Sequence, residues 1–173
     1  MNRVELIVLD FDGGPDLVAC LESISLQSEL PTRLVLFDNG SSIPLSDRMK
    51  DRSWPFETMI VREERNTGFT GGINRSMNAI TTPYVGWINN DVVLDREWLT
   101  TLRAALDADD RLGAVHAGMA RFRPAQRHAH GLAVGLGVHV ERHLAVGHEL
   151  DDAEERSGQR RRHLLDLGRR VFV

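Results

Sequence analysis

The fold is decided by a ten-residue stretch, Val85-Gly86-Trp87-Ile88-Asn89-Asn90-Asp91-Val92-Val93-Leu94. Its first four residues are apolar and β-rich, which predicts a buried strand. A polar triplet ending in the carboxylate of Asp91 follows, and then a second apolar run turns toward a helix. In open α/β sheets, ligands bind just beyond the carboxyl ends of the strands. The stretch therefore predicts that Asp91 lies where such a protein holds a metal ion or a phosphate-bearing ligand.

The composition is that of an ordinary soluble globular domain. The chain has 173 residues, 42% hydrophobic and 27% charged, which predicts a single domain with a substantial core. Its formal net charge of −4 argues against a nucleic-acid partner. The single cysteine, Cys20, excludes an internal disulfide, and its place in a helical pattern predicts core packing. The chain shows no signal peptide and no apolar run of about 20 residues, so we expect a cytoplasmic protein.

Strand and helix patterns alternate along the first 120 residues. Helices are predicted from Pro15, around Ile73 to Ile80, and from a cap at Asp95. Apolar β-rich runs predict strands at residues 4–9, 33–37, 58–61, 84–88 and 112–116. This alternation predicts an α/β fold, a mostly parallel sheet flanked by helices. Beyond it we expect loops or a hairpin over 121–148, a charged helix over 151–167, and the start of a strand at 170–173.

Four polar or glycine-rich loops follow these strands: residues 10–14, 38–42, 66–72 and 89–91. Because the carboxyl ends of parallel strands meet at one edge of a sheet, we expect these loops to lie together. A glycine-rich loop before a helix brings backbone donors close to an anion or a base. Each loop alone is also typical of an ordinary turn, so it is their combination that predicts a ligand site. Magnesium in proteins uses one or two carboxylates plus the phosphates of a substrate, so Asp91 alone is chemically sufficient beside a diphosphate.

Three motifs in this order resemble glycosyltransferase family 2, particularly its rhamnosyltransferase-like members. They are Asp38-Asn39-Gly40-Ser41-Ser42, then Asn66-Thr67-Gly68-Phe69-Thr70-Gly71-Gly72-Ile73-Asn74, then Asn89-Asn90-Asp91-Val92. The resemblance covers residues 3–120 well and 121–173 loosely. It implies a fold of the nucleotide-sugar-binding type called GT-A, Rossmann-like in its nucleotide-binding half.

The resemblance also implies a donor site. Asp38 would contact the base or ribose, and the backbone around Asp10 and Phe11 would line the base pocket. The remaining donor-binding positions would be Asn66, Gly72, Asn74 and Asn89.

The implied chemistry is an inverting transfer of a sugar from a nucleotide-diphosphate donor to a glycan or lipid-linked acceptor. Asn89 would take the first position of the family's Asp-any-Asp motif, and Asp91 would take its metal-binding last position, holding Mg²⁺ or Mn²⁺. The metal would neutralise charge that grows on the departing diphosphate.

Two departures from the family pattern bear on catalysis. The loop after the first strand is acidic at Asp10 and Asp12, which is unfavourable beside a diphosphate unless these side chains point away. The family's later acceptor region, with the Glu-Asp pair that supplies the base, has no counterpart, so no catalytic base is identified. We therefore expect a truncated form: a donor-binding region at 1–120 and a partial acceptor side at 121–173 of one domain. A catalytically incomplete nucleotide-sugar-binding fragment is the first alternative.

A second alternative is a haloacid-dehalogenase-like phosphatase. Two aspartates two residues apart at a strand end, Asp10 and Asp12, also resemble its nucleophile and acid/base pair. That chemistry also needs a lysine and a later aspartate pair, each after a buried strand. The candidates are Lys50, which lies in an irregular polar stretch, and Asp109-Asp110, which lie at the end of a predicted helix.

A histidine pair and an arginine cluster in the last third of the chain each allow two interpretations. His139 and His143 stand four residues apart, but their glycine-interrupted surroundings favour a loop over a metal site. The arginines between Arg156 and Arg170 would suit peripheral contact with an anionic membrane at its inner face, or a solvated helix face.

Overall fold

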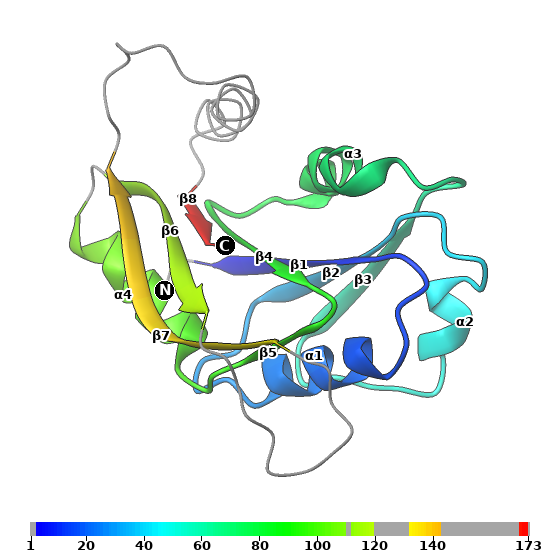
Figure 1. Cartoon of the computed structure of the whole chain (residues 1–173), viewed down its shortest axis with the longest axis horizontal. Coiled ribbons are helices and arrows are strands. Elements are labelled where there is room, and N and C mark those ends of the chain that lie inside the picture. Colours follow the sequence, from blue (N-terminus) through cyan, green and yellow to red (C-terminus); the bar gives the residue numbers. More distant parts are fainter. Residues whose placement is uncertain (1–2, 110–111, 120–131, 143–169, 173) are drawn as a thin grey trace.

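The computed structural model describes residues 3–109, 112–119, 132–142 and 170–172, and it contains an eight-stranded sheet. The strands are β1 (Val4–Asp10), β2 (Arg33–Asp38), β3 (Glu57–Arg62), β4 (Tyr84–Asn89), β5 (Val92–Leu94), β6 (Leu112–Met119), β7 (Leu132–Arg142) and β8 (Arg170–Phe172). The helices are α1 (Pro15–Ser25), α2 (Leu45–Met49), α3 (Gly68–Ser76) with a following 3₁₀ turn η1 (Met77–Ala79), and α4 (Trp98–Ala108). The strand order is β3-β2-β1-β4-β8-β6-β7-β5 (Figure 1).

The prediction of an α/β fold with a mostly parallel sheet is confirmed. β1 pairs in parallel with β2 and β4, β2 with β3, and β8 with β4 and β6. β6 and β7 form an antiparallel pair, so of the loops or hairpin expected over 121–148 the described residues contain one strand, β7, whose partner β6 lies before that range. The strand expected at the end of the chain is β8, which inserts between β4 and β6.

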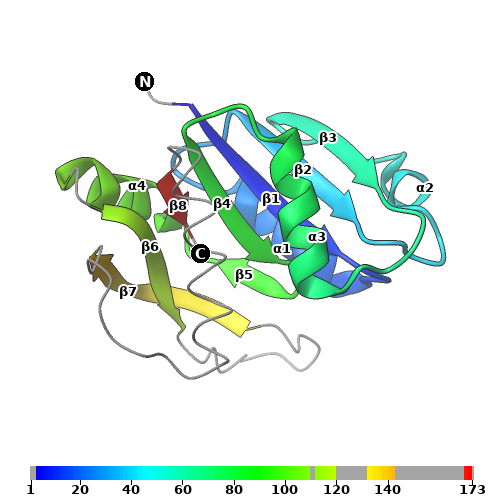
Figure 2. The ribbon, with the colours of Figure 1, turned by 90° about the horizontal axis from the view of Figure 1, so that it is seen from above.

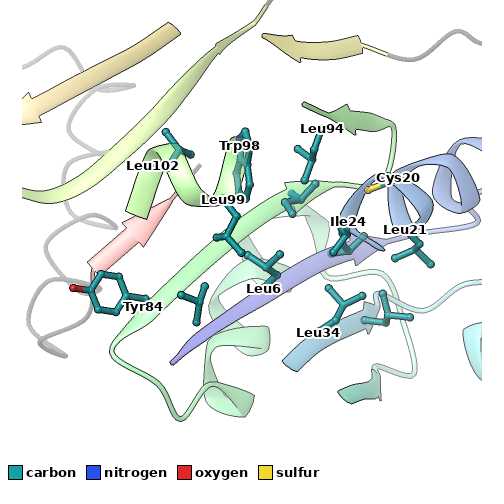
Figure 3. Packing of buried hydrophobic residues seen from close by; sticks show 14 of the residues in the cluster. Leu6, Cys20, Leu21, Ile24, Leu34, Tyr84, Leu94, Trp98, Leu99 and Leu102 are labelled. Carbon is teal, nitrogen blue, oxygen red and sulfur yellow. The ribbon is translucent and has the colours of Figure 1, made fainter. Parts of the chain in front are cut away.

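Alternate residues of the central strands face two separate apolar layers. Leu6 and Val8 of β1 belong to the larger cluster, which also contains the buried residues of α1, α2 and α4. Ile7 faces the other way and packs with Met77 and Ile80, next to α3. Figures 1 and 2 show α1 and α3 on opposite faces of the sheet, and Figure 3 shows side chains from α1 and α4 gathered against Leu6 and Leu34. The sheet is thus covered on both faces, as near-continuous apolar parallel strands require.

Helix α1 follows the pattern expected from the sequence. Pro15 occupies its first turn, where a missing N–H costs nothing, and the residues that repeat at helical spacing are buried. Cys20 is one of them and is fully buried, as predicted. Burial raises the pKa of the Cys20 thiol to about 12, so this thiol is not a nucleophile near neutral pH.

Three local expectations differ from the structure. Val92 to Leu94 form a short strand, β5, because they pair with residues 132–134 of β7, far along the chain. Helix α4 begins at Trp98, and Asp95 instead accepts a hydrogen bond from the Glu97 N–H two residues on (2.9 Å). Helix α3 begins inside the glycine-rich loop and ends at Ser76.

The helix expected over residues 151–167 and His143 lie outside the described residues. Among the residues that the structure does describe, no helix combines the length and the apolar composition needed to cross a bilayer.

Candidate functional site

The carboxyl ends of four parallel strands meet at one edge of the sheet. In the register, Asp10 at the end of β1 lies beside Asp38 of β2, which lies beside Arg62 of β3. On the other side of β1, Leu9 lies beside Asn89 at the end of β4. The predicted convergence of the polar loops is therefore present in the fold.

A cavity of about 310 Å³ lies at this edge. It is lined by Leu9, Phe11, Asn39, Asn66, Gly68, Phe69, Asn89, Asn90 and Asp91. Its size is at the lower end of the range for small-molecule sites, and it joins apolar faces to a few polar groups, as such sites do. Four of the predicted donor-site and metal-site residues line it, namely Phe11, Asn66, Asn89 and Asp91. Its lining does not include the other four, Asp10, Asp38, Gly72 and Asn74.

Two phenylalanine rings on this cavity are exposed. Phe11 is 48% exposed and Phe69 is 62% exposed. Phe69 was not among the predicted site residues, although an aromatic residue within a glycine-rich loop is a signal for it. Gly68, before it, has a φ of +74°, a backbone conformation that glycine adopts at little cost. The turn at Gly68 is therefore followed at once by the exposed ring of Phe69.

Asn39 fastens the glycine-rich loop to the end of β2. Its side chain is 2% exposed, and its amide nitrogen donates to Asn66 Oδ1 and to the Gly68 carbonyl, each at 3.1 Å. Its amide oxygen accepts from the Thr67 N–H (3.1 Å) and the Thr67 hydroxyl (2.8 Å). Both donors and both acceptor positions are used, so Asn39 shapes the cavity wall. The local pattern predicts only a turn here, because the partners of Asn39 lie 27 to 29 residues away.

Asp38 is fully buried and bound within the protein. One carboxylate oxygen accepts from the Ser41 N–H (2.8 Å), and the other accepts from the Leu45 N–H (2.8 Å) and from Arg62. Burial alone raises the pKa of Asp38, but the hydrogen bonds from Leu45, Ser41 and Arg62 outweigh it and hold the pKa below its ordinary value of 3.8. In this structure Asp38 holds the loop into α2, and its contact with a nucleoside stays a prediction.

The acidic side chains of Asp10, the last residue of β1, and of Asp12 do not line the cavity. Asp10 is fully buried and bound to Arg48 and Asn90. Asp12 accepts from the Ser42 N–H (2.7 Å) and hydroxyl (2.8 Å), which lower the pKa of Asp12. The repulsion expected between these acids and a diphosphate is thereby reduced. A buried, arginine-bound Asp10 also does not favour the phosphatase interpretation, because its nucleophile must reach substrate.

Gly72 and Asn74 stand on α3, outside the cavity lining. A methyl group added at Gly72 would lie 2.6 Å from Leu9 Cδ1 and 3.2 Å from Asn39 Nδ2, so this glycine lets α3 pack closely on β1. Asn74 is exposed. Their predicted contacts with the donor remain predictions.

Asp91 is an exposed carboxylate in the turn between β4 and β5. Within the described part of the chain it makes no ion pair, and no group of three or more metal-ligating side chains occurs. The free carboxylate of Asp91 and the amide oxygen of Asn89, which line the same cavity, are hard oxygen donors. They fit a cation whose remaining ligands come from phosphates and water, the usual arrangement for Mg²⁺.

The lowered pKa of Asp38 predicts a loss of stability in acid. Because the folded state binds the proton less readily than the unfolded chain, the stabilisation is complete above the ordinary carboxyl pKa and falls as the pH drops through the lower, folded pKa. Urea unfolding at pH 7, 5, 4 and 3 should show this fall below about pH 4. Asp38→Asn should be less stable at pH 7 and show a shallower fall, whereas an unchanged slope would contradict the assignment.

Comparisons with known proteins agree on one family. The sequence matches the family described as Glycosyl transferase family 2 over residues 6–162. A comparison with curated proteins found no match. Among solved structures, the mannosyltransferase PcManGT from Pyrobaculum calidifontis, in complex with GDP-Man and Mn²⁺, matches with a TM-score of 0.59 and 22% identity, over 69% of this chain and 36% of that one.

S. aureus TarS 1-349 in complex with UDP-GlcNAc matches with a TM-score of 0.58 and 16% identity, over 72% of this chain and 37% of that one. The structure titled S. aureus TarS matches with a TM-score of 0.55 and 15% identity, over 71% of this chain and 23% of that one. The chain thus spans less than two fifths of the length of these structures, which share its GT-A fold. The family match covers most of the sequence, and the chain belongs to glycosyl transferase family 2.

Proposed function

We propose that this chain binds the nucleotide-diphosphate end of a sugar donor in the cavity at the carboxyl edge of its sheet. The observation that carries the proposal is that two exposed phenylalanine rings and a free carboxylate, Asp91, line the same cavity. Membership of glycosyl transferase family 2 supports it. So do two structures of the same fold, one in complex with UDP-GlcNAc and the other in complex with GDP-Man and Mn²⁺.

We assign each lining residue to the part of the donor that its side chain can bind. Phe11 and Phe69 offer ring faces on which a planar base can stack. Asn66 and Asn89 offer amide groups for the ribose and phosphate oxygens. Asp91 holds Mg²⁺ or Mn²⁺ together with the diphosphate, and such a cation supplies neutralisation of negative charge on the leaving group.

Asp38 keeps its proposed role as a contact for the base or ribose. A carboxylate has about four acceptor positions, and three of those on Asp38 are used by Ser41, Leu45 and Arg62. A further hydrogen bond from a ribose hydroxyl fits this count, but it requires the loop over Asp38 to open, because the side chain is fully buried. Gly72 and Asn74 of α3 keep their proposed role of completing the nucleotide pocket.

The reaction that follows is an inverting sugar transfer. An acceptor hydroxyl oxygen forms a bond to the anomeric carbon, the bond from that carbon to the diphosphate breaks, and the nucleoside diphosphate leaves with the electron pair. A carboxylate base takes the hydroxyl proton, and we assign that base to no residue of this chain. Residues 1–120 form the donor region and 121–173 belong to the acceptor side of the same domain. The acceptor is a glycan or a lipid-linked glycan of the cell envelope.

The location of this activity follows from the same proposal. We place it in the cytoplasm, at the inner face of the membrane, where the arginines between Arg156 and Arg170 contact anionic lipid. This part rests on the sequence alone, because residues 143–169 lie outside those that the structure describes.

Donor turnover separates this function from its two alternatives. With UDP- and GDP-sugars and MnCl₂, we expect release of nucleoside diphosphate, increased by added acceptor glycans and abolished by EDTA. Binding without release would favour the donor-binding fragment. Hydrolysis of a generic aryl phosphate in place of donor turnover would support the phosphatase and contradict the proposal.

A further inference from the structure

Asp10 carries a buried carboxylate that the proposed donor site does not contact. One of its oxygens, Oδ2, is bound by Arg48 and lies 3.5 Å from the Ser41 hydroxyl. The other, Oδ1, accepts a hydrogen bond of 2.8 Å from Nδ2 of Asn90. Asn90 immediately precedes Asp91 in the turn between β4 and β5. Asp10 therefore joins two distant segments: Arg48, 38 residues later in the sequence, and Asn90 of the Asp91 turn, 80 residues later.

Arg48 makes this link rigid. Its guanidinium also donates to the Gly13 carbonyl, to the Ser41 hydroxyl (3.2 Å) and to the Ile43 carbonyl (3.2 Å). A planar guanidinium fixed at four acceptors leaves little freedom for the carboxylate it holds. The position of Asp10 Oδ1, and so of the Asn90 side chain, is set by three separate segments of the chain.

Gly13 packs directly against the hydrogen bond between Asp10 and Asn90. A methyl group added there would overlap Asp10 Oδ1 and would lie 2.6 Å from Asn90 Nδ2. At the neighbouring Gly14, an added methyl group meets no atom within 4 Å. The close approach is thus specific to the hydrogen bond between Asp10 and Asn90.

Asp91 has no such support of its own. Within the described residues, no hydrogen bond or ion pair holds its side chain, so its direction depends on the backbone of its turn. We infer that Asp10 is a positioning residue: through Asn90, it holds the turn so that the Asp91 carboxylate faces the diphosphate and its cation. This inference rests on the proposed function, and it explains why an acid stands at the end of β1 without repelling the donor.

Asn90→Ala tests the inference, with Ser42→Ala as the control. Each removes one inter-loop hydrogen-bonding side chain, but the hydroxyl of Ser42 donates to Asp12, which lies in another loop from the Asp91 turn. The probes are UDP and GDP, titrated with MnCl₂ and again with EDTA. For Asn90→Ala we expect the gain in affinity from Mn²⁺, measured as the ratio of the dissociation constants in EDTA and in MnCl₂, to fall about tenfold, as outer-shell changes at metal sites typically give. Ser42→Ala should match the wild type in both conditions.

Gly13→Ala provides a second, independent variant, with Gly14→Ala as its control. It should weaken Mn²⁺-dependent binding as Asn90→Ala does, while the thermal midpoint of each variant reports whether it folds. The inference is overturned if Asn90→Ala and Gly13→Ala keep the full gain from Mn²⁺, or lose affinity equally with and without it. A wild type that binds neither nucleotide, or gains nothing from Mn²⁺, instead overturns the proposed function, and the inference with it.

Discussion

Asp91→Ala should remove the metal dependence of nucleotide binding. Among the described residues that line the cavity, Asp91 alone carries a carboxylate, and the phosphates can supply the other charged ligands of a cation. Where the wild type binds UDP or GDP about 100-fold more tightly with Mn²⁺ than with EDTA, the variant should show a gain below about threefold. Calorimetric titration in both conditions measures this difference.

Two controls make the result specific to the site. Asp51→Ala removes another exposed aspartate, outside the cavity, and should leave the Mn²⁺-dependent gain intact. Affinity in EDTA should not fall in Asp91→Ala, because Phe11 and Phe69 still receive the base and the change removes a carboxylate that repels the diphosphate when no cation is present. If Asp91→Ala retained the full gain from Mn²⁺, its assignment as the metal ligand would be wrong.

Arg48→Met should cause a large loss of stability. It leaves the fully buried Asp10 without its cation, and breaking a buried ion pair from one side typically costs about 3–5 kcal/mol in the free energy of unfolding. Urea denaturation at pH 7 measures this loss. Arg52→Met, which removes an exposed arginine three residues after α2, should change stability by less than about 0.5 kcal/mol.

The double variant Arg48→Met/Asp10→Asn separates the ion pair from the packing of the arginine stem. Removing the orphaned charge should recover roughly 1–3 kcal/mol of the loss, the range for directly coupled residues. Full additivity of the two single changes would mean that the two side chains do not stabilise each other, which would contradict the geometry at the end of β1.

The sequence predicted the framework of this fold because its signals are local. Apolar runs between turn-forming residues marked β1, β2 and β4, and Pro15 marked the start of α1. The convergence of strand ends follows from parallel pairing alone, so the sequence pattern was sufficient to place Asn89 and Asp91 at the edge of the sheet. Strand β5 could not be foreseen, because its three residues become a strand only by pairing with β7, which is distant in sequence.

The site was predicted in part for the same reason. Phe11 and Asn66 line the cavity as expected, whereas Asn39 was predicted only as part of a turn. Its role depends on four hydrogen bonds to a loop distant in sequence, which no periodicity reveals. Likewise, the carboxylates of Asp10 and Asp12 are unfavourable beside a diphosphate only if they lack partners. In the fold, Arg48 binds Asp10 and Ser42 binds Asp12.

A crystal structure with a nucleoside diphosphate and MnCl₂ tests the central proposal most directly. We expect an anomalous manganese peak bound to a carboxylate oxygen of Asp91 and to the diphosphate, with the base against Phe11 and Phe69. A nucleotide bound away from this edge, manganese without contact to Asp91, or no nucleotide at saturating concentration would contradict the proposed donor site.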